Sequence, residues 1–130
     1  MKTIFFILSL FFITSCDKND ETSQETADLV GSWYLMSFNP GFGQTENYNT
    51  GDIIWIINSD NSINVTLNIT TSTQLPLNAN GIYSYNIISN DSVSIENVDY
   101  EYLIEEEQTL KLLDNPSSDG IILTFQKTGN

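Results

Sequence analysis

The chain has 130 residues, of which 17 are acidic and four are basic, and its formal net charge at pH 7 is −13. Such a charge repels the phosphates of nucleic acids and anionic lipid headgroups, so neither is expected as a partner. Histidine and arginine are absent, and nucleophilic catalysis of the Ser-His or Cys-His kind therefore lacks its base.

The first segment is short, apolar and followed by the single cysteine of the chain, Cys16. Lys2 precedes an almost unbroken run of Ile, Phe and Leu over residues 4–13. Ten helical residues rise only about 15 Å, half of a bilayer core, so this run fits the h-region of a signal peptide better than a membrane span. Ile13-Thr14-Ser15-Cys16 resembles the bacterial lipobox, which implies a signal peptide over residues 1–15 and a lipid on Cys16. The alternative for Cys16 is a buried free thiol.

Removal of the first fifteen residues would leave 115 residues with a net charge of −14, because Lys2 is lost. Residues 16–28 are polar and acidic without an apolar period, which predicts a disordered tether between lipid and domain. Lys18 with acidic residues after it resembles the export signal of Bacteroidota surface lipoproteins, although the composition fits a plain solvated linker equally well. We therefore expect an outer-membrane lipoprotein, facing the periplasm or the cell surface, whose acyl chains hold it to the membrane.

From residue 29 onward apolar and polar residues alternate, the period of two that is typical of strands with one buried face. Clusters of Asn, Asp, Ser and Gly separate the runs as turns. The predicted strands are 30–38, 53–57, 63–70, 83–87, 93–95, 100–104, 110–112 and 121–125. Eight sequential strands over residues 29–128 favour an all-β antiparallel meander that closes into a small barrel, because closure removes exposed edges. A two-sheet β-sandwich is the alternative.

The predicted hairpin between strands 100–104 and 110–112 gives a specific register. If residues 105–107, three glutamates, form its loop, Tyr102 lies opposite Leu110 on the inner face. On the outer face Glu101 then lies opposite Lys111, which is a favourable cross-strand pair. Because the three glutamates supply no glycine for the left-handed position of such a loop, a longer loop with the same register is the alternative.

The opening of the first strand, Leu29-Val30-Gly31-Ser32-Trp33, resembles the Gly-x-Trp start of lipocalins. In that family the tryptophan closes the bottom of the barrel and packs against a basic residue near the end of the last strand. The resemblance therefore implies that Gly31, Trp33 and Lys127 close the barrel here. Segments 58–62, 81–83, 102–112 and 119–125 resemble the small lipocalin-like lipoproteins of Bacteroidota, so the resemblance covers nearly the whole domain.

Carboxylates are the remaining candidates for catalysis or metal binding, and their pattern favours neither. Glu101 and Glu105 share a strand face, but it is the predicted outer face, where carboxylates stay solvated. Asp114 and Asp119 bracket a loop that offers oxygen ligands to calcium, but the spacing does not match an EF-hand and the same residue types form ordinary turns. We expect no catalytic residues, no metal and no cofactor.

An eight-stranded barrel is just wide enough to be filled by side chains or to hold one small ligand. The many large inward residues predict a mostly filled interior with a shallow mouth, and the glycine-rich loop 39–51 would form a lip or a plug there. The segment 53–57 is apolar on both faces, so its outer face needs a cover. The candidate ligand-binding residues are Phe42, Tyr48, Trp55, Tyr83 and Tyr85.

Two functions fit these expectations. The first is a non-catalytic binding module for a small apolar molecule or a glycan. The second is a structural or interaction protein with a filled barrel that presents a surface patch to an envelope partner.

Overall fold

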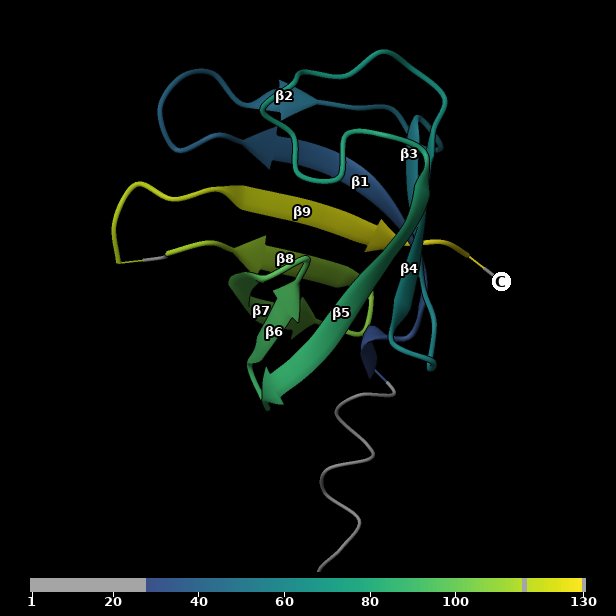
Figure 1. Ribbon diagram of the computed structural model, residues 1–130. Helices are drawn as coiled ribbons and strands as arrows, with labels where there is room; N and C mark the ends of the chain where they lie inside the picture. Colours follow the sequence, from purple (N-terminus) through teal and green to yellow (C-terminus); the bar gives the residue numbers. More distant parts are fainter. Residues whose placement is uncertain (1–27, 116, 130) are drawn as a thin grey trace, which may run out of the picture.

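A computed structural model describes residues 28–115 and 117–129 of the chain. Asp28 and Leu29 form a short helical turn, and the strands follow it (Figure 1). The strands are β1 (Gly31–Asn39), β2 (Glu46–Asn47), β3 (Ile53–Ile57), β4 (Ser62–Leu67), β5 (Gly81–Ser89), β6 (Ser92–Ile95), β7 (Val98–Glu105), β8 (Thr109–Leu113) and β9 (Ile122–Lys127). The predicted signal peptide and Cys16 lie outside the described residues.

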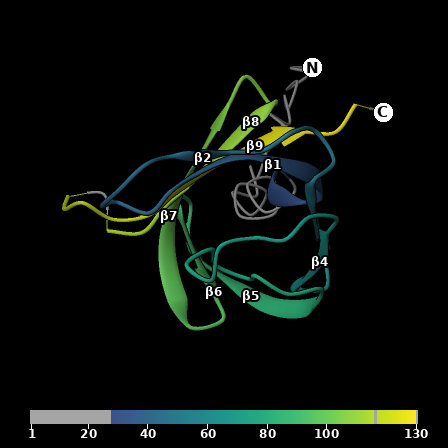
Figure 2. The same cartoon turned by 90° about the horizontal axis from the view of Figure 1, so that it is seen from above.

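The strands form one closed antiparallel barrel. From β3 to β9 each strand pairs with the next one along the chain, β1 pairs with β3, and β9 pairs back with β1. Figure 2 shows the resulting ring from above. The predicted all-β barrel is therefore confirmed. The alternative, a two-sheet sandwich, is wrong, because the pairing of β1 with β9 joins the first and last strands into a single sheet.

β1 forms one side of the barrel and pairs with three strands. Its first half pairs with β3, and its end pairs with the two-residue strand β2, which lies inside the predicted loop 39–51. Two residues are too few to show an alternation of apolar and polar positions, so β2 is not predicted from the sequence. On the other edge the register with β9 shifts between Leu35 and Ser37, a bulge that lets both Leu35 and Phe38 face inward although they are three residues apart.

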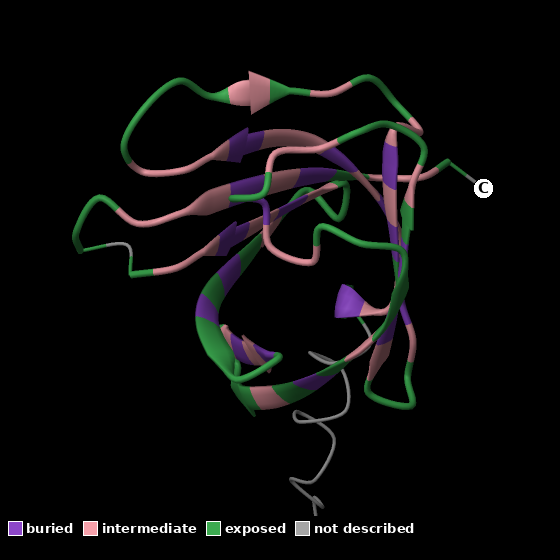
Figure 3. Ribbon diagram, turned by 45° about the horizontal axis from the view of Figure 1, so that its top comes forward, coloured by how far each residue is buried: buried purple, intermediate pink, exposed green. Residues whose placement is uncertain are grey.

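The middle of the barrel is packed with large apolar side chains. Buried and more exposed positions alternate along the strands, as Figure 3 shows, which confirms the predicted period of two. The largest fully buried side chains are Trp33, Trp55, Phe38, Phe125, Leu29, Leu35, Ile53, Ile63, Leu110, Leu112 and Leu123. The ring centroids of Trp55 and Phe125 lie 4.8 Å apart in a tilted arrangement that aromatic pairs favour.

The predicted register of the β7–β8 hairpin is wrong by two residues, although the inner face is right. Tyr102 pairs with Leu112, and Lys111 pairs with Leu103 instead of Glu101. The loop consists of residues 106–108, in which two glutamates take the left-handed conformation without a glycine, with φ of 51° and 58°. Because the shift is an even number of residues, every side chain keeps its predicted face.

The outer face of β3 is only partly covered. Ile54 is half-buried, whereas Ile56 is 38% exposed and Ile82 on β5 is 74% exposed. Both lie in one row across the sheet, since Ile56 pairs with Asn64 and Asn64 pairs with Ile82. The predicted cover over this face is therefore not supplied in full by residues 28–115 and 117–129.

Candidate functional site

An apolar groove, the rim groove, lies at one end of the barrel between three loops. Its volume is about 410 Å³. It is lined by Phe38, Pro40, Phe42, Gln74 and Ile121. Phe38 is the last inward-facing residue of β1 and is fully buried, whereas Phe42 in the following loop is 80% exposed. The groove thus has a buried floor and an exposed aromatic lip.

The loop that carries Phe42 is fixed by a side-chain cap and two glycines. The amide of Gly41 donates a hydrogen bond to Oδ1 of Asn39 at 2.8 Å. Gly41 and Gly43 have φ of 84° and 116°, in the region that favours glycine. A Cβ on Gly41 would collide with the carbonyl oxygen of Asp119, so this loop packs directly against the β8–β9 loop. The backbone is therefore held in place while the Phe42 ring remains in contact with solvent.

The β4–β5 loop, residues 68–80, crosses the end of the barrel (Figures 1 and 2). Leu75 in this loop is 3% exposed and belongs to the hydrophobic core. Its exposed neighbour Gln74 lines the rim groove. The root of the loop is tied to the top of β3, where the amide of Asn68 donates to the carbonyl oxygen of Asp52 at 2.8 Å. Leu75 therefore closes the interior, and the same loop supplies one wall of the groove.

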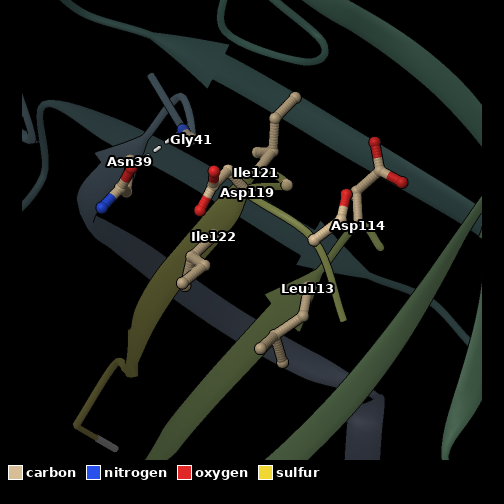
Figure 4. A pocket seen from close by; sticks show the side chains of 9 residues that line it. Asn39, Gly41, Leu113, Asp114, Asp119, Ile121 and Ile122 are labelled. Carbon is tan, nitrogen blue, oxygen red and sulfur yellow. Dashed lines mark hydrogen bonds between the residues drawn. The ribbon is translucent and has the colours of Figure 1, made fainter. Parts of the chain in front are cut away.

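A second pocket of about 250 Å³ adjoins the groove at Ile121, which lines both. It is built from the end of β8, the β8–β9 loop and the residues after β1, and Asp114 and Asp119 are among its lining residues. Figure 4 shows the Asp119 carboxylate turned toward Asn39, whereas that of Asp114 points away from it. Within residues 28–115 and 117–129 no group of three or more His, Cys, Asp or Glu side chains is placed to hold a metal ion.

Of the five predicted ligand-binding residues, Phe42 alone lines the rim groove. Trp55 lies in the interior, 1% exposed, and its indole N–H has no hydrogen-bond partner among the described residues. Tyr85 is also buried, and its hydroxyl donates to the carbonyl oxygen of Asn58 at 2.7 Å. Burial, followed by the charge of Asp60, raises the pKa of Tyr85, so its phenol stays protonated as a donor.

The other two predicted residues, Tyr48 and Tyr83, pack partly against the core near the ends of strands. The hydroxyl of Tyr48 donates to Oε2 of Glu46 at 2.6 Å. Burial raises the pKa of Tyr48, and the hydrogen bond and charge of Glu46 raise it further. The hydroxyl of Tyr83 donates to the carbonyl oxygen of Ala79 at 2.8 Å. Both hydroxyls thus hold neighbouring segments in place.

Four residues of the groove are not predicted from the sequence. The period of two that turns Leu35 inward would turn Phe38 outward, and the bulge that turns Phe38 inward has no sequence signal. The strand period of Ile121 assigns it to a filled interior. Pro40 lies two residues before Phe42, and every second residue from Phe38 to Phe42 lines the groove. Gln74 sits in a loop without a period. The isolated Leu75 beside it, in a stretch of polar residues, is the one available signal that this loop folds back onto the core.

At the other end of the barrel, Lys127 lies over Trp33, with 5.4 Å between its Nζ and the ring centroid. The indole N–H of Trp33 donates to the carbonyl oxygen of Leu29 at 2.9 Å. A Cβ on Gly31, whose φ is 150°, would lie 3.5 Å from Cε of Lys127. Gly31, Trp33 and Lys127 are thus adjacent, and the barrel-closing role that the resemblance implies for them stays a prediction.

The described part of the chain, residues 28–115 and 117–129, contains no helix of the length and apolarity needed to cross a membrane. Cys16 lies outside this part, and its lipidation stays a prediction.

No protein-family model matches the sequence, and no curated protein matches it. Among solved structures, the crystal structure of a lipocalin-like protein from Bacteroides uniformis is similar, with a TM-score of 0.54 and 15% sequence identity. The match covers 78% of this chain and 99% of that one. At this identity the likeness shows the fold alone. Together with the closed antiparallel ring, it identifies the domain as a lipocalin-like β-barrel.

Proposed function

We propose that this chain is an envelope lipoprotein whose barrel is a non-catalytic binding module for a small apolar molecule or a glycan. The observation that carries the proposal is the rim groove, an apolar groove of about 410 Å³ beside a phenylalanine that is 80% exposed. Ligand sites are typically concave and mostly apolar, with a few polar groups that fix orientation. Here Gln74 is the polar group among apolar walls.

The filled interior supports a site at the rim rather than in the middle of the barrel. Trp55 and Phe125 pack together in the interior, Trp33 fills the end near Lys127, and Leu75 covers the opposite end of the barrel. A ligand that binds without displacing these side chains therefore contacts the groove from outside. Phe42 supplies the apolar surface that it would bury, or the ring on which a sugar would stack.

The position of the groove also suits an anchored protein. β1 begins beside the helical turn at Asp28 and ends at the loop that carries Phe42, so the groove lies at the far end of β1 from the chain's entry (Figure 1). A lipid on Cys16, twelve positions before Asp28, would thus be attached at the end away from the groove. The groove would remain open to the periplasm or the medium.

The binding proposal is tested by native mass spectrometry of the protein purified from its own host. A retained small molecule that is lost in the Phe42→Ala variant supports binding at the groove. A bare mass for both proteins, with no change in Phe42 resonances on addition of small apolar molecules or sugars, contradicts it.

The anchor is tested separately. Cys16→Ala is expected to release the protein from membranes, and continued membrane retention would refute the lipid anchor. Protease treatment of whole cells then separates the two orientations, because only a surface-facing domain is cleaved.

One observation favours the second candidate, an interaction protein. Ile56 and Ile82 lie in one row on the outer face, and Ile82 is 74% exposed. An envelope protein that packs there would bury both side chains. Crosslinking in cells that captures the same partner with the wild type but not with Ile82→Asp would support this candidate. Unchanged crosslinking would exclude this face.

A further inference from the structure

We propose that the ligand of the rim groove carries a positive charge, as an apolar chain or ring attached to an ammonium head. This inference rests on the proposed function, since it names the chemical class of molecule that the same groove takes. It is carried by the charges around the groove and by the exposed ring at its lip.

Two carboxylates lie next to residues that line the rim groove. Glu46 on β2 is the cross-strand partner of Phe38, and paired residues point to the same side of a sheet. Asp119 lines the pocket that shares Ile121 with the groove, and its carboxylate is turned toward Asn39 (Figure 4). The groove walls are thus apolar while the groups around them are anionic.

The lysines of residues 28–115 and 117–129 do not neutralise these carboxylates. Nζ of Lys111 lies 3.3 Å from Oε2 of Glu105, and Lys127 lies over Trp33 at the other end of the barrel. Neither lysine lines the groove or the adjoining pocket. The field at the groove is therefore negative, which repels the head of a fatty acid and attracts an ammonium group.

Phe42 adds a second feature that suits a cation. Its side chain is 80% exposed, so a face of its ring is open to a ligand. Ammonium groups bind over aromatic faces within about 6 Å of the ring centre. Phe38, Pro40 and Ile121 form the apolar walls for the rest of the molecule.

The size of the charge effect follows from Coulomb's law. A carboxylate roughly 8 Å from the ligand head changes the affinity of a monovalent ligand about two-fold in water, in opposite directions for a cation and an anion. Each carboxylate therefore changes the ratio of the two affinities about four-fold, and two such carboxylates predict that a cation binds about sixteen-fold more tightly than an anion with the same chain at low ionic strength. The ratio should fall to a few-fold in physiological salt, because the Debye length is then about 8 Å.

The test is calorimetric titration of the full protein with decyltrimethylammonium, decanol and decanoate below their aggregation limits at pH 7. We expect one site, an affinity that decreases in that order, and a cation-to-anion ratio that shrinks with added salt. Asp119→Asn should weaken binding of the cation about two-fold. Glu106→Gln, which removes one charge from the exposed β7–β8 loop, is the matched control and should leave it unchanged.

Each other outcome has a defined meaning. If the anion binds as tightly as the cation and Phe42→Ala removes both, the groove binds ligands and the charge inference is overturned. If the cation binds Phe42→Ala as tightly as the wild type, the cation binds the acidic surface at large, and the inference is again overturned. If none of the three molecules binds the wild type, the proposed binding of apolar molecules fails, and the charge inference fails with it.

Discussion

Leu75 is the side chain by which the β4–β5 loop covers the barrel, and its truncation should destabilise the protein more than any other change in that loop. The residue is 3% exposed and lies within the core cluster, although the loop around it is largely polar. In Leu75→Ala the buried methyl groups are lost and the interior below them opens toward solvent.

The expected cost is at the lower end of the usual range. Leu-to-Ala substitutions in cores cost about 2–5 kcal/mol, with the spread set by how far the surroundings collapse into the cavity. The β4–β5 loop contains no strand and can settle inward, so we expect about 2–3 kcal/mol. For a domain of this size the midpoint of thermal unfolding falls by about 4–8 °C for each kcal/mol.

Urea unfolding of the wild type and two variants measures this cost. Ile69→Ala is the matched control from the same loop, because Ile69 is 37% exposed and its truncation should cost less than about 1 kcal/mol. A hydrophobic dye should also bind more strongly to Leu75→Ala than to the control. If the two variants unfold at the same urea concentration, Leu75 does not close the barrel and the description of the loop as its cover is wrong.

Three further predictions concern charged and titrating groups. Burial, followed by the charge of Asp114, raises the pKa of Tyr100 to about 12 from its ordinary value of about 10, so the stability that its neutral phenol gives is complete below pH 10 and is lost as the pH rises toward 12. An alkaline absorbance titration should show a tyrosine that ionises only with unfolding, and ionisation of all tyrosines near pH 10 in the folded protein would contradict this. Lys127→Met removes the cation over Trp33 and should cost about 0.5–1 kcal/mol in urea unfolding; no cost would mean that the contact is not formed in solution. Lys111→Met breaks the exposed bridge to Glu105 and should cost less than about 1 kcal/mol, with no difference left at high salt; a larger cost that persists in high salt would be at odds with a surface pair.

The barrel itself could be predicted because its rules are local. Strands such as residues 63–67 repeat every second residue, and one buried face per strand is enough to define the inside of a closed sheet. The number of main strands and their antiparallel order follow from the short turns between them. The closing pair of β1 with β9 is long-range, but closure is the usual way in which eight such strands avoid open edges.

The register of the β7–β8 hairpin could not be predicted correctly, because a loop at residues 105–107 and a loop at residues 106–108 both lack a glycine that would distinguish them. Glu106 and Glu107 adopt φ values that normally favour glycine. The hairpin accepts this cost and gains the pairing of Tyr102 with Leu112 and of Ile104 with Leu110. Placing Glu101 opposite Lys111 favours the wrong loop, because an exposed ion pair contributes little to the stability of the hairpin.

The candidate site could be predicted only in part, and for a different reason. Phe42 stands out as an aromatic residue between glycines, and it does line the groove. The aromatic side chains of Trp55 and Tyr85 fill the interior. No sequence pattern distinguishes an aromatic residue that fills a barrel from one that binds a ligand. Gln74 reaches the groove only because Leu75 folds the loop inward, a contact between segments far apart in the sequence.

The central claim is that ligands bind at the rim groove while the filled interior stays undisturbed. Two-dimensional NMR of the isotope-labelled protein titrated with decyltrimethylammonium tests it most directly, because the indole N–H of Trp55 reports on the interior and the amides of Phe42, Gln74 and Ile121 report on the rim. We predict shifts at those three amides and an unchanged Trp55 indole signal. A shifted indole signal with unchanged rim amides would place the ligand inside the barrel and contradict the account.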